Sequence, residues 1–179
     1  MQLIKRSDWC PAKAPDYAAM IPRRIVLHHS YSPTSAQWRG ARTVDGIWRY
    51  HVKSNGWSDI GYHYIVSPDG LEVYEGRPVS ALGAHCGGNP PAGALRNFGN
   101  SGSIGICLIG NYDLEEPTAN AALALGMFVA DLRAKFGIPE ADVLGHFECW
   151  DQPPKTCPGK HLAEAMGMGA RWRKAFPGS

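Results

Sequence analysis

Residues 145–159 bring together side chains that could carry chemistry: a histidine, two cysteines, two acids and a lysine lie in one short stretch. His146 and Cys157 can supply half of a zinc site, because imidazole nitrogen and thiolate sulfur are ligands that zinc prefers. Two ligands do not hold a catalytic zinc, so a third must come from elsewhere in the chain. The best donor is His28, which with His29 ends a short apolar run. Neighbouring residues of a strand point to opposite faces, so we expect only one of these two histidines to face the site.

The segments that must position these side chains have the patterns of β-strands. Residues 25–29 are β-branched and apolar, and residues 103–110 form a near-continuous apolar run, so both predict buried strands. Residues 60–66 and 71–75 flank a Pro-Asp-Gly turn and predict a hairpin. Residues 142–145 predict a short strand that leads directly into the metal-binding stretch.

Helices are predicted between these strands. Apolar residues recur at near-helical spacing over residues 34–54 and 118–136, and residues 161–176 predict a last helix with a basic end. Residues 76–102 are rich in glycine, proline and asparagine, and a loop of this length in a compact domain is usually functional. Residues 1–22 are rich in proline, alanine and lysine and predict an irregular arm.

Strands that alternate with helices, together with one hairpin, predict an α/β fold. We expect a single domain over residues 1–179, with a central mixed β-sheet of about five or six strands flanked by helices. Its core would span about 24–160, with the N-terminal arm 1–22 and the C-terminal helix 161–176 outside it. Sites in such sheets collect where strand ends open into loops, so the zinc site is expected at strand ends.

The bulk composition is that of an ordinary globular protein. Hydrophobic residues make up 44% and charged residues 19% of the 179 positions, enough for one domain with its own core. The net charge of +2 is too small to indicate nucleic acid and would tolerate an anionic polymer such as a cell wall. We expect no signal peptide, because the N-terminal residues 1–9 have no apolar core of the length that one needs. We expect no membrane span, because no apolar run approaches roughly 18 residues. Five cysteines without framework spacing fit a reducing compartment.

Several segments follow one another in an order that matches a known family. They are Val26-Leu27-His28-His29-Ser30, Gly61-Tyr62-His63-Tyr64-Ile65-Val66 with Asp69-Gly70, Ala84-His85, Ser103-Ile104-Gly105-Ile106-Cys107-Leu108-Ile109-Gly110, and Gly145-His146 with Lys155-Thr156-Cys157-Pro158-Gly159. In this order they resemble the zinc-dependent N-acetylmuramoyl-L-alanine amidases of the type-2 class. That class includes bacteriophage lysozyme-type amidases and animal peptidoglycan-recognition proteins. Each motif alone is weak, but the ordered set, which covers residues 24–160, is specific.

This resemblance implies that His28, His146 and Cys157 bind zinc and that Tyr62 and Lys155 assist catalysis. Zinc with three protein ligands keeps a fourth position open for water and lowers the pKa of that water towards about 7. A cation two residues from a ligand suits Lys155 to stabilise the oxyanion formed when an amide carbonyl is attacked. The phenol of Tyr62 can orient the water or the amide by hydrogen bonding.

Other polar residues have less specific expectations. His85, in the long loop, is expected to contact the sugar or peptide of the substrate. Glu148 is either an acceptor that orients a zinc ligand or an exposed loop acid. We expect His63 to be structural, because it should point away from the side of Tyr62, and the basic end at residues 171–174 to be a solvated helix tail.

The resemblance leaves two other functions open. A non-catalytic peptidoglycan-binding module is one, although such proteins lack the ligand cysteine that Cys157 provides. A cytoplasmic muropeptide-recycling amidase is the other, but those enzymes carry aspartate at the position of Cys157 and glutamate as the assisting residue instead of Tyr62. A zinc deaminase is excluded, because His146-Phe147-Glu148 is not followed by the Pro-Cys-x-x-Cys motif that such enzymes need.

We therefore predict a Zn²⁺-dependent amidase that cleaves the bond between N-acetylmuramic acid and L-alanine in peptidoglycan. The expected partner is the peptidoglycan substrate, with no nucleic acid and no transmembrane segment, and the expected oligomeric state is a monomer. The lack of a signal peptide favours a phage or prophage endolysin, which would stay in the host cytoplasm before lysis and then act on the cell wall.

Overall fold

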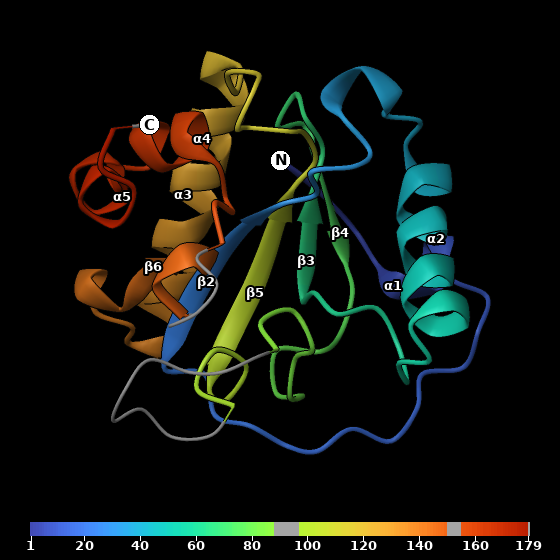
Figure 1. The fold of residues 1–179 in the computed structure, drawn as a ribbon. Helices are drawn as coiled ribbons and strands as arrows, with labels where there is room; N and C mark the ends of the chain where they lie inside the picture. Colours follow the sequence, from blue (N-terminus) through green and yellow to red (C-terminus); the bar gives the residue numbers. More distant parts are fainter. Residues whose placement is uncertain (88–96, 150–154, 179) are drawn as a thin grey trace.

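A computed structural model describes residues 1–87, 97–149 and 155–178 and shows a six-stranded sheet between two groups of helices (Figure 1). The strand order is β1-β4-β3-β5-β2-β6. β3 and β4 are antiparallel and the other pairs are parallel, so the sheet is mixed. The predicted α/β fold with a mixed sheet of five or six strands is therefore confirmed. The strands are β1 (Gln2–Ile4), β2 (Arg24–His29), β3 (Tyr64–Val66), β4 (Glu72–Glu75), β5 (Ser103–Leu108) and β6 (Val143–Gly145).

β2 and β5 lie inside the sheet and are covered on both faces. Every residue of β5 and all but the first of β2 are buried, which explains why both sequences are near-continuous apolar runs. In this parallel pair Leu27 lies opposite Ile106, and His28 lies opposite Cys107. Opposite residues point to the same face, so Leu27 and Ile106 share one face while His28 and Cys107 share the other.

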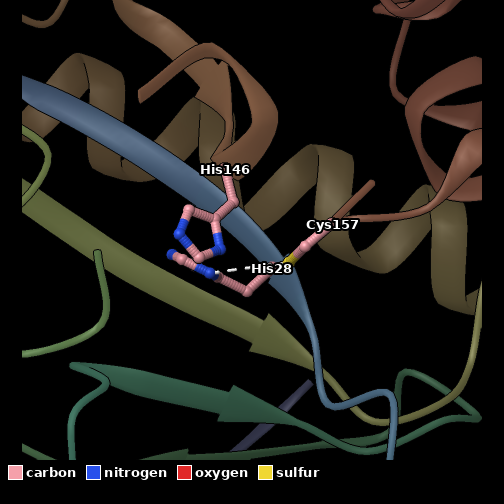
Figure 2. A group of neighbouring side chains, drawn as sticks. All are labelled: His28, His146 and Cys157. Atoms are coloured by element: carbon pink, nitrogen blue, oxygen red, sulfur yellow. Dashed lines mark hydrogen bonds between the residues drawn. The ribbon is translucent and has the colours of Figure 1, made fainter. Parts of the chain in front are cut away.

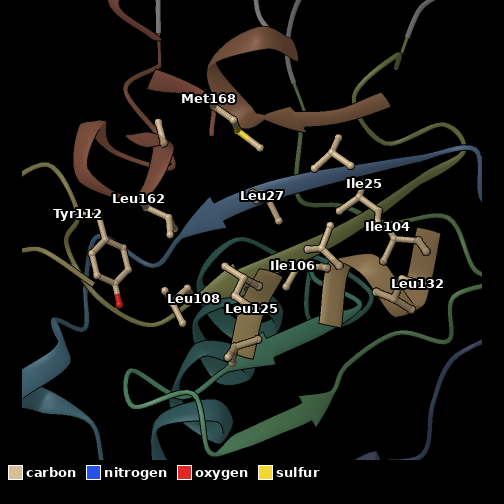
Figure 3. Packing of buried hydrophobic residues seen from close by; sticks show 14 of the residues in the cluster. Ile25, Leu27, Ile104, Ile106, Leu108, Tyr112, Leu125, Leu132, Leu162 and Met168 are labelled. Carbon is tan, nitrogen blue, oxygen red and sulfur yellow. The ribbon is translucent and has the colours of Figure 1, made fainter. Parts of the chain in front are cut away.

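One face of the sheet is covered by α3 (Ala119–Phe136), α4 (Lys160–Ala165) and α5 (Gly169–Ala175) (Figure 1). The side chain of Thr118 accepts a backbone hydrogen bond in the first turn of α3 and so caps this helix. Gly137 ends α3 in the left-handed conformation, with φ of 65°, which favours glycine. The layer between these helices and the sheet is filled by Ile25, Leu27, Ile104, Ile106, Leu108, Leu125, Leu132, Leu162 and Met168 (Figure 3).

The other face carries α1 (Arg6–Trp9) and α2 (Ala41–Arg49), which continues into a π-helical turn, η2 (Tyr50–Ser54). The apolar side chains buried in this layer are Trp9, Val44, Ile60, Ile65, Tyr74 and Ile109. Short 3₁₀ segments connect the larger elements: η1 (Ser35–Gln37), η3 (Glu140–Asp142) and η4 (His146–Cys149). Across the described ranges, no helix combines the length and the apolar content needed to cross a bilayer.

The prediction that residues 1–22 form an irregular arm is wrong for their first part. β1 pairs with β4 and extends the sheet by one strand. The buried carboxylate of Asp59 then ties the following residues to the body, since it lies 3.2 Å from the Arg6 guanidinium and accepts a hydrogen bond from the Tyr17 hydroxyl. The N-terminal residues are therefore part of the domain.

Two further elements differ from the sequence-based expectation. The last helix, expected over 161–176, is broken into α4 and α5 at Gly167, whose φ of 73° ends the first segment. At its basic end Arg171, Arg173 and Lys174 are exposed, as expected. Trp172 is not solvated: it is buried, with 4% of its surface exposed, and its indole donates a hydrogen bond to the Thr156 carbonyl at 3.2 Å. The strand expected over 60–66 forms only at Tyr64–Val66.

Candidate functional site

Two of the predicted ligands are placed side by side by the pairing of β2 with β6. Leu27 lies opposite Gly145 in this parallel pair, so the residues that follow, His28 and His146, emerge next to each other. Their ring centroids are 4.5 Å apart. Figure 2 shows the two imidazoles and the side chain of Cys157 converging on one point.

The third predicted ligand comes from the loop before α4. The backbone N–H of Phe147 donates to the Cys157 carbonyl at 2.8 Å, which fixes this loop against η4. Gly159 lets the loop pass Tyr112: a Cβ at Gly159 would lie 2.3 Å from the Tyr112 carbonyl carbon, and its φ of 90° favours glycine. The thiol sulfur of Cys157 thereby lies 3.7 Å from Nδ1 of His28.

These three side chains fit a zinc ion. One donor atom from each lies within 4.8 Å of the others. Tetrahedral zinc with bonds of about 2.0 Å to nitrogen and about 2.3 Å to sulfur requires a nitrogen-to-sulfur distance of about 3.5 Å. The 3.7 Å between His28 Nδ1 and Cys157 Sγ is close to that distance, so little movement is needed to accommodate the ion. Two imidazoles and one thiolate also leave a fourth position open, as in catalytic zinc sites.

The protonation states of the three side chains also suit a metal. Burial lowers the pKa of His28 well below its ordinary value, and burial with the nearby Lys155 lowers the pKa of His146 to about 3. Both rings are therefore neutral at pH 7, which is the form that binds metals. Burial raises the pKa of the Cys157 thiol, so this thiol keeps its proton until a cation displaces it.

Tyr62 and Lys155 lie at the same cavity as the three candidate ligands. The cavity has a volume of about 310 Å³ and is lined by His28, His29, Tyr31, Tyr62, His146, Lys155, Thr156 and Cys157. The ring centroid of Tyr62 lies 5.4 Å from that of His28. Burial, followed by contact with Cys107, raises the pKa of the Tyr62 phenol, so its hydroxyl keeps its proton at neutral pH. The structure thus brings together the five residues expected to bind metal or to assist catalysis.

A larger cavity of about 690 Å³ adjoins the first one. Tyr31 and Tyr62 line both cavities, so the two share a wall. The larger cavity is lined by the loop after β2 and by one side of α2 and η2, through Ser30, Tyr31, Ser32, Pro33, Thr43, Gly46, Ile47, Tyr50, His51 and Tyr62. Its hydroxyls and aromatic rings are suited to a ligand with both polar and apolar groups.

His85 is not where a substrate contact would be. It is buried, with 7% of its surface exposed, and its Nδ1 lies 2.9 Å from Nε2 of His28. The expectation that His85 touches the sugar or peptide is therefore wrong. Its ring is buried against His28, a candidate zinc ligand, and does not lie in the open cavity. Gly83 and Gly105 leave the space for this ring: a Cβ at either position would lie within 2.6 Å of a ring atom.

Other polar residues have structural partners. His63 accepts a hydrogen bond from Gly105 N at Nδ1, 2.9 Å away, and is fully buried, as its predicted structural role requires. Glu148 is half-buried and accepts from Gly145 N at 2.8 Å, while its other oxygen lies 3.0 Å from Arg171. Glu148 therefore holds the backbone just before His146.

The sequence interpretation missed Cys107 as a neighbour of Tyr62. Cys107 is fully buried, and its side chain raises the pKa of the Tyr62 phenol. The sequence could have predicted this neighbour. Side chains alternate along β5, so every second residue from Ser103, including Cys107, points to the same face of the sheet as His28.

Known proteins resemble this chain over most of its length. The family model described as N-acetylmuramoyl-L-alanine amidase matches residues 18–160. Peptidoglycan recognition protein 1 of Bos indicus is 30% identical over 182 residues, which cover 96% of this chain and 86% of that protein. The N-acetylmuramoyl-L-alanine amidase of Homo sapiens is 32% identical over 148 residues, which cover 79% of this chain and 23% of the human protein.

Solved structures share the fold. Wild-type Drosophila PGRP-LB matches with a TM-score of 0.73 at 27% identity, covering 98% of this chain and 94% of that one. A mutant of Drosophila PGRP-LB in complex with tracheal cytotoxin matches with a TM-score of 0.70 at 28% identity, with the same two coverages. The sequence match spans well over half of the chain and the fold agrees along nearly all of it, so this chain belongs to the N-acetylmuramoyl-L-alanine amidase family.

Proposed function

We propose that this protein is a zinc-dependent amidase that hydrolyses the bond between N-acetylmuramic acid and the L-alanine of the peptidoglycan stem peptide. The observation that carries the proposal is the convergence of His28, His146 and Cys157, with donor atoms within 4.8 Å of one another. A module that only binds peptidoglycan needs a groove, but it has no need of three metal-binding side chains around an open position. Membership of the amidase family supports the same reaction class.

The chain's own residues have distinct tasks in this proposal. Zinc, when bound by the two histidines and the cysteine, supplies an acidified water and a Lewis acid for the amide carbonyl. The Tyr62 phenol lines the same cavity and orients the amide group by hydrogen bonding. The Lys155 ammonium lines the same cavity and stabilises the negative charge that develops on the carbonyl oxygen.

The larger cavity is proposed to hold the rest of the substrate. Its volume of about 690 Å³ lies within the usual range of ligand sites. It shares Tyr31 and Tyr62 with the smaller cavity, which contains the proposed zinc ligands. A stem peptide with a sugar at one end has both polar and apolar groups, as does this lining. The complex of a Drosophila PGRP-LB mutant with tracheal cytotoxin supports a ligand of the same chemical type here.

The test is a product analysis of purified peptidoglycan digested by the zinc-loaded protein. Mass spectrometry is expected to find glycan chains without peptides together with intact stem peptides that carry a free L-alanine amine. Cys157→Ser is the matched control, because it replaces one atom of the site, and it is expected to lose both zinc and activity. New reducing sugar ends, or cuts within the stem peptide, would contradict the proposal.

A peptidoglycan-recognition module is the second candidate, favoured by the match to peptidoglycan recognition protein 1 over 96% of this chain. A recognition module would bind peptidoglycan in its zinc-loaded form without releasing stem peptides, and Cys157→Ser would bind equally well.

Two other roles have their own tests. Cleavage of free muropeptides but not of the polymer would indicate the muropeptide-recycling role. The endolysin role, in which the protein stays in the host cytoplasm before lysis, remains a prediction. Expression of the protein in bacteria with and without a membrane-permeabilising protein tests it.

A further inference from the structure

A chain of buried hydrogen bonds leads from His28 into the backbone of β5. Nε2 of His28 lies 2.9 Å from Nδ1 of His85, and Nε2 of His85 lies 3.3 Å from the carbonyl oxygen of Ser103. All three residues are buried, with at most 7% of their surfaces exposed. The first link faces away from the proposed zinc position, since it is the other ring nitrogen of His28, Nδ1, that lies near Cys157.

The partners in this chain decide which nitrogens carry protons. The Ser103 carbonyl only accepts hydrogen bonds, so Nε2 of His85 must hold a proton. The His85 ring is buried, which favours its neutral form, and a neutral imidazole has one proton. Nδ1 of His85 is therefore an acceptor. The facing nitrogen, Nε2 of His28, must then be the donor. Nδ1 of His28 then carries no proton and presents its lone pair to the Cys157 sulfur, 3.7 Å away.

The surroundings hold the His85 ring in this position. A Cβ at Gly105 would lie 2.3 Å from the ring and one at Gly83 would lie 2.6 Å from it, so only glycine at these two positions leaves it room. The side chain of Asn100 accepts hydrogen bonds from the backbone N–H groups of His85 at 2.9 Å and Cys86 at 2.8 Å. The ring therefore has little freedom to turn away from His28.

We propose that His85 is a positioning residue that locks His28 in the Nε2-protonated tautomer and so presents the Nδ1 lone pair to zinc. This inference rests on the proposed role of His28 as a zinc ligand. Partners of this kind raise the basicity of a ligating imidazole and fix its orientation, and their loss typically weakens metal binding about 10–100-fold. The role differs from a contact with substrate, because His85 would act through His28.

Two substitutions of similar size separate this role from simple packing. In His85→Asn the amide lies near the former Nδ1, so its oxygen can still accept the hydrogen bond from His28. In His85→Gln the amide lies near the former Nε2, so it keeps the partner at Ser103 and loses the one at His28. The zinc dissociation constant, measured by competition with a chelator, is expected to rise about 10–100-fold in His85→Gln and to change far less in His85→Asn.

The control is His63→Gln, the same change in a neighbouring buried histidine whose ring nitrogens contact Ala81 and Gly105. It is expected to lower the unfolding midpoint without a comparable change in zinc affinity. Equal zinc affinities for His85→Asn and His85→Gln would overturn the inference.

NMR of the wild-type protein tests the tautomer without any substitution. Long-range ¹H–¹⁵N correlation spectra of the metal-free protein are expected to show His28 and His85 protonated at Nε2. A proton on Nδ1 of His28 would refute the inference even if the variants fail to fold. If the wild type binds no zinc but shows these tautomers, the proposed function fails while the hydrogen-bond chain stands.

Discussion

Acid is expected to weaken the folded state through histidines that are buried without charge, and His63 allows this effect to be measured at one residue. The ring is fully buried between Gly105 and Ala81, and burial lowers its pKa to about 4. In the unfolded chain the same ring has a pKa near 6.5. The folded pKa is the lower one, so the contribution of His63 to stability is complete above about pH 6.5 and is lost as the pH falls towards 4.

The magnitude follows from the two pKa values. Between about pH 7.5 and about pH 5.5 the unfolded chain takes up almost one proton at His63 while the folded protein takes up almost none. Linkage then gives a loss of about 1.3 kcal/mol in the free energy of unfolding from this residue. The effect has a second source of the same size in His51, which is also buried and whose pKa is lowered to about 4.

Urea unfolding at these two pH values, with a chelator present, measures the effect. His63→Asn keeps an acceptor for the Gly105 N–H but removes the ionisable ring, so its loss of stability on acidification is expected to be about 1.3 kcal/mol smaller than that of the wild type. Ile65→Val is the control, since it trims a buried side chain and should lower stability equally at both pH values. If His63→Asn loses as much stability on acidification as the wild type, the assignment of a buried neutral ring is refuted.

Three further substitutions test other parts of the structure. Lys155→Ala is expected to keep zinc and to lower kcat about 10²–10³-fold, as the loss of an oxyanion-stabilising group does, and an unchanged kcat would remove Lys155 from the mechanism. Gly105→Ala is expected to lower the free energy of unfolding by about 1–3 kcal/mol in urea, because the added methyl overlaps the His85 ring; a neutral result would show that the ring moves freely. Trp172→Ala is expected to cost about 3–5 kcal/mol in the same assay, whereas a solvated helix end would cost almost nothing.

The strands and the long helix were predictable because their patterns are local. β2 and β5 are apolar runs, a pattern typical of strands that are buried on both faces of a sheet. α3 has an N-terminal cap, a long apolar stretch and a glycine at its C-terminal end. The order of strands was not predictable, since nothing in the local sequence joins β2 to β6. β1 has only three residues, two of them exposed, and shows no alternation that would distinguish it from a loop.

The candidate metal site was predictable because its side chains have a rare combination of types. The alternation of strand residues explains why His28 and not His29 faces it, and the N–H of Tyr112 occupies Nδ1 of His29 on the other side. His85 shows what the sequence conceals. A histidine in a glycine-rich loop is usually expected at the surface, but here the small volume of Gly105, from a strand across the sheet, admits its ring to the interior.

The place of β2 in the sheet has a consequence for how the chain is made. Its neighbours, β5 at Ser103–Leu108 and β6 at Val143–Gly145, both lie far downstream in the sequence. A nascent chain that has emerged only up to residue 100 therefore contains a strongly apolar strand with both edges unpaired, which is prone to association with other chains. Stable folding must wait until residues 143–145 are available, so synthesis of the first half alone is expected to yield an aggregating fragment instead of a subdomain.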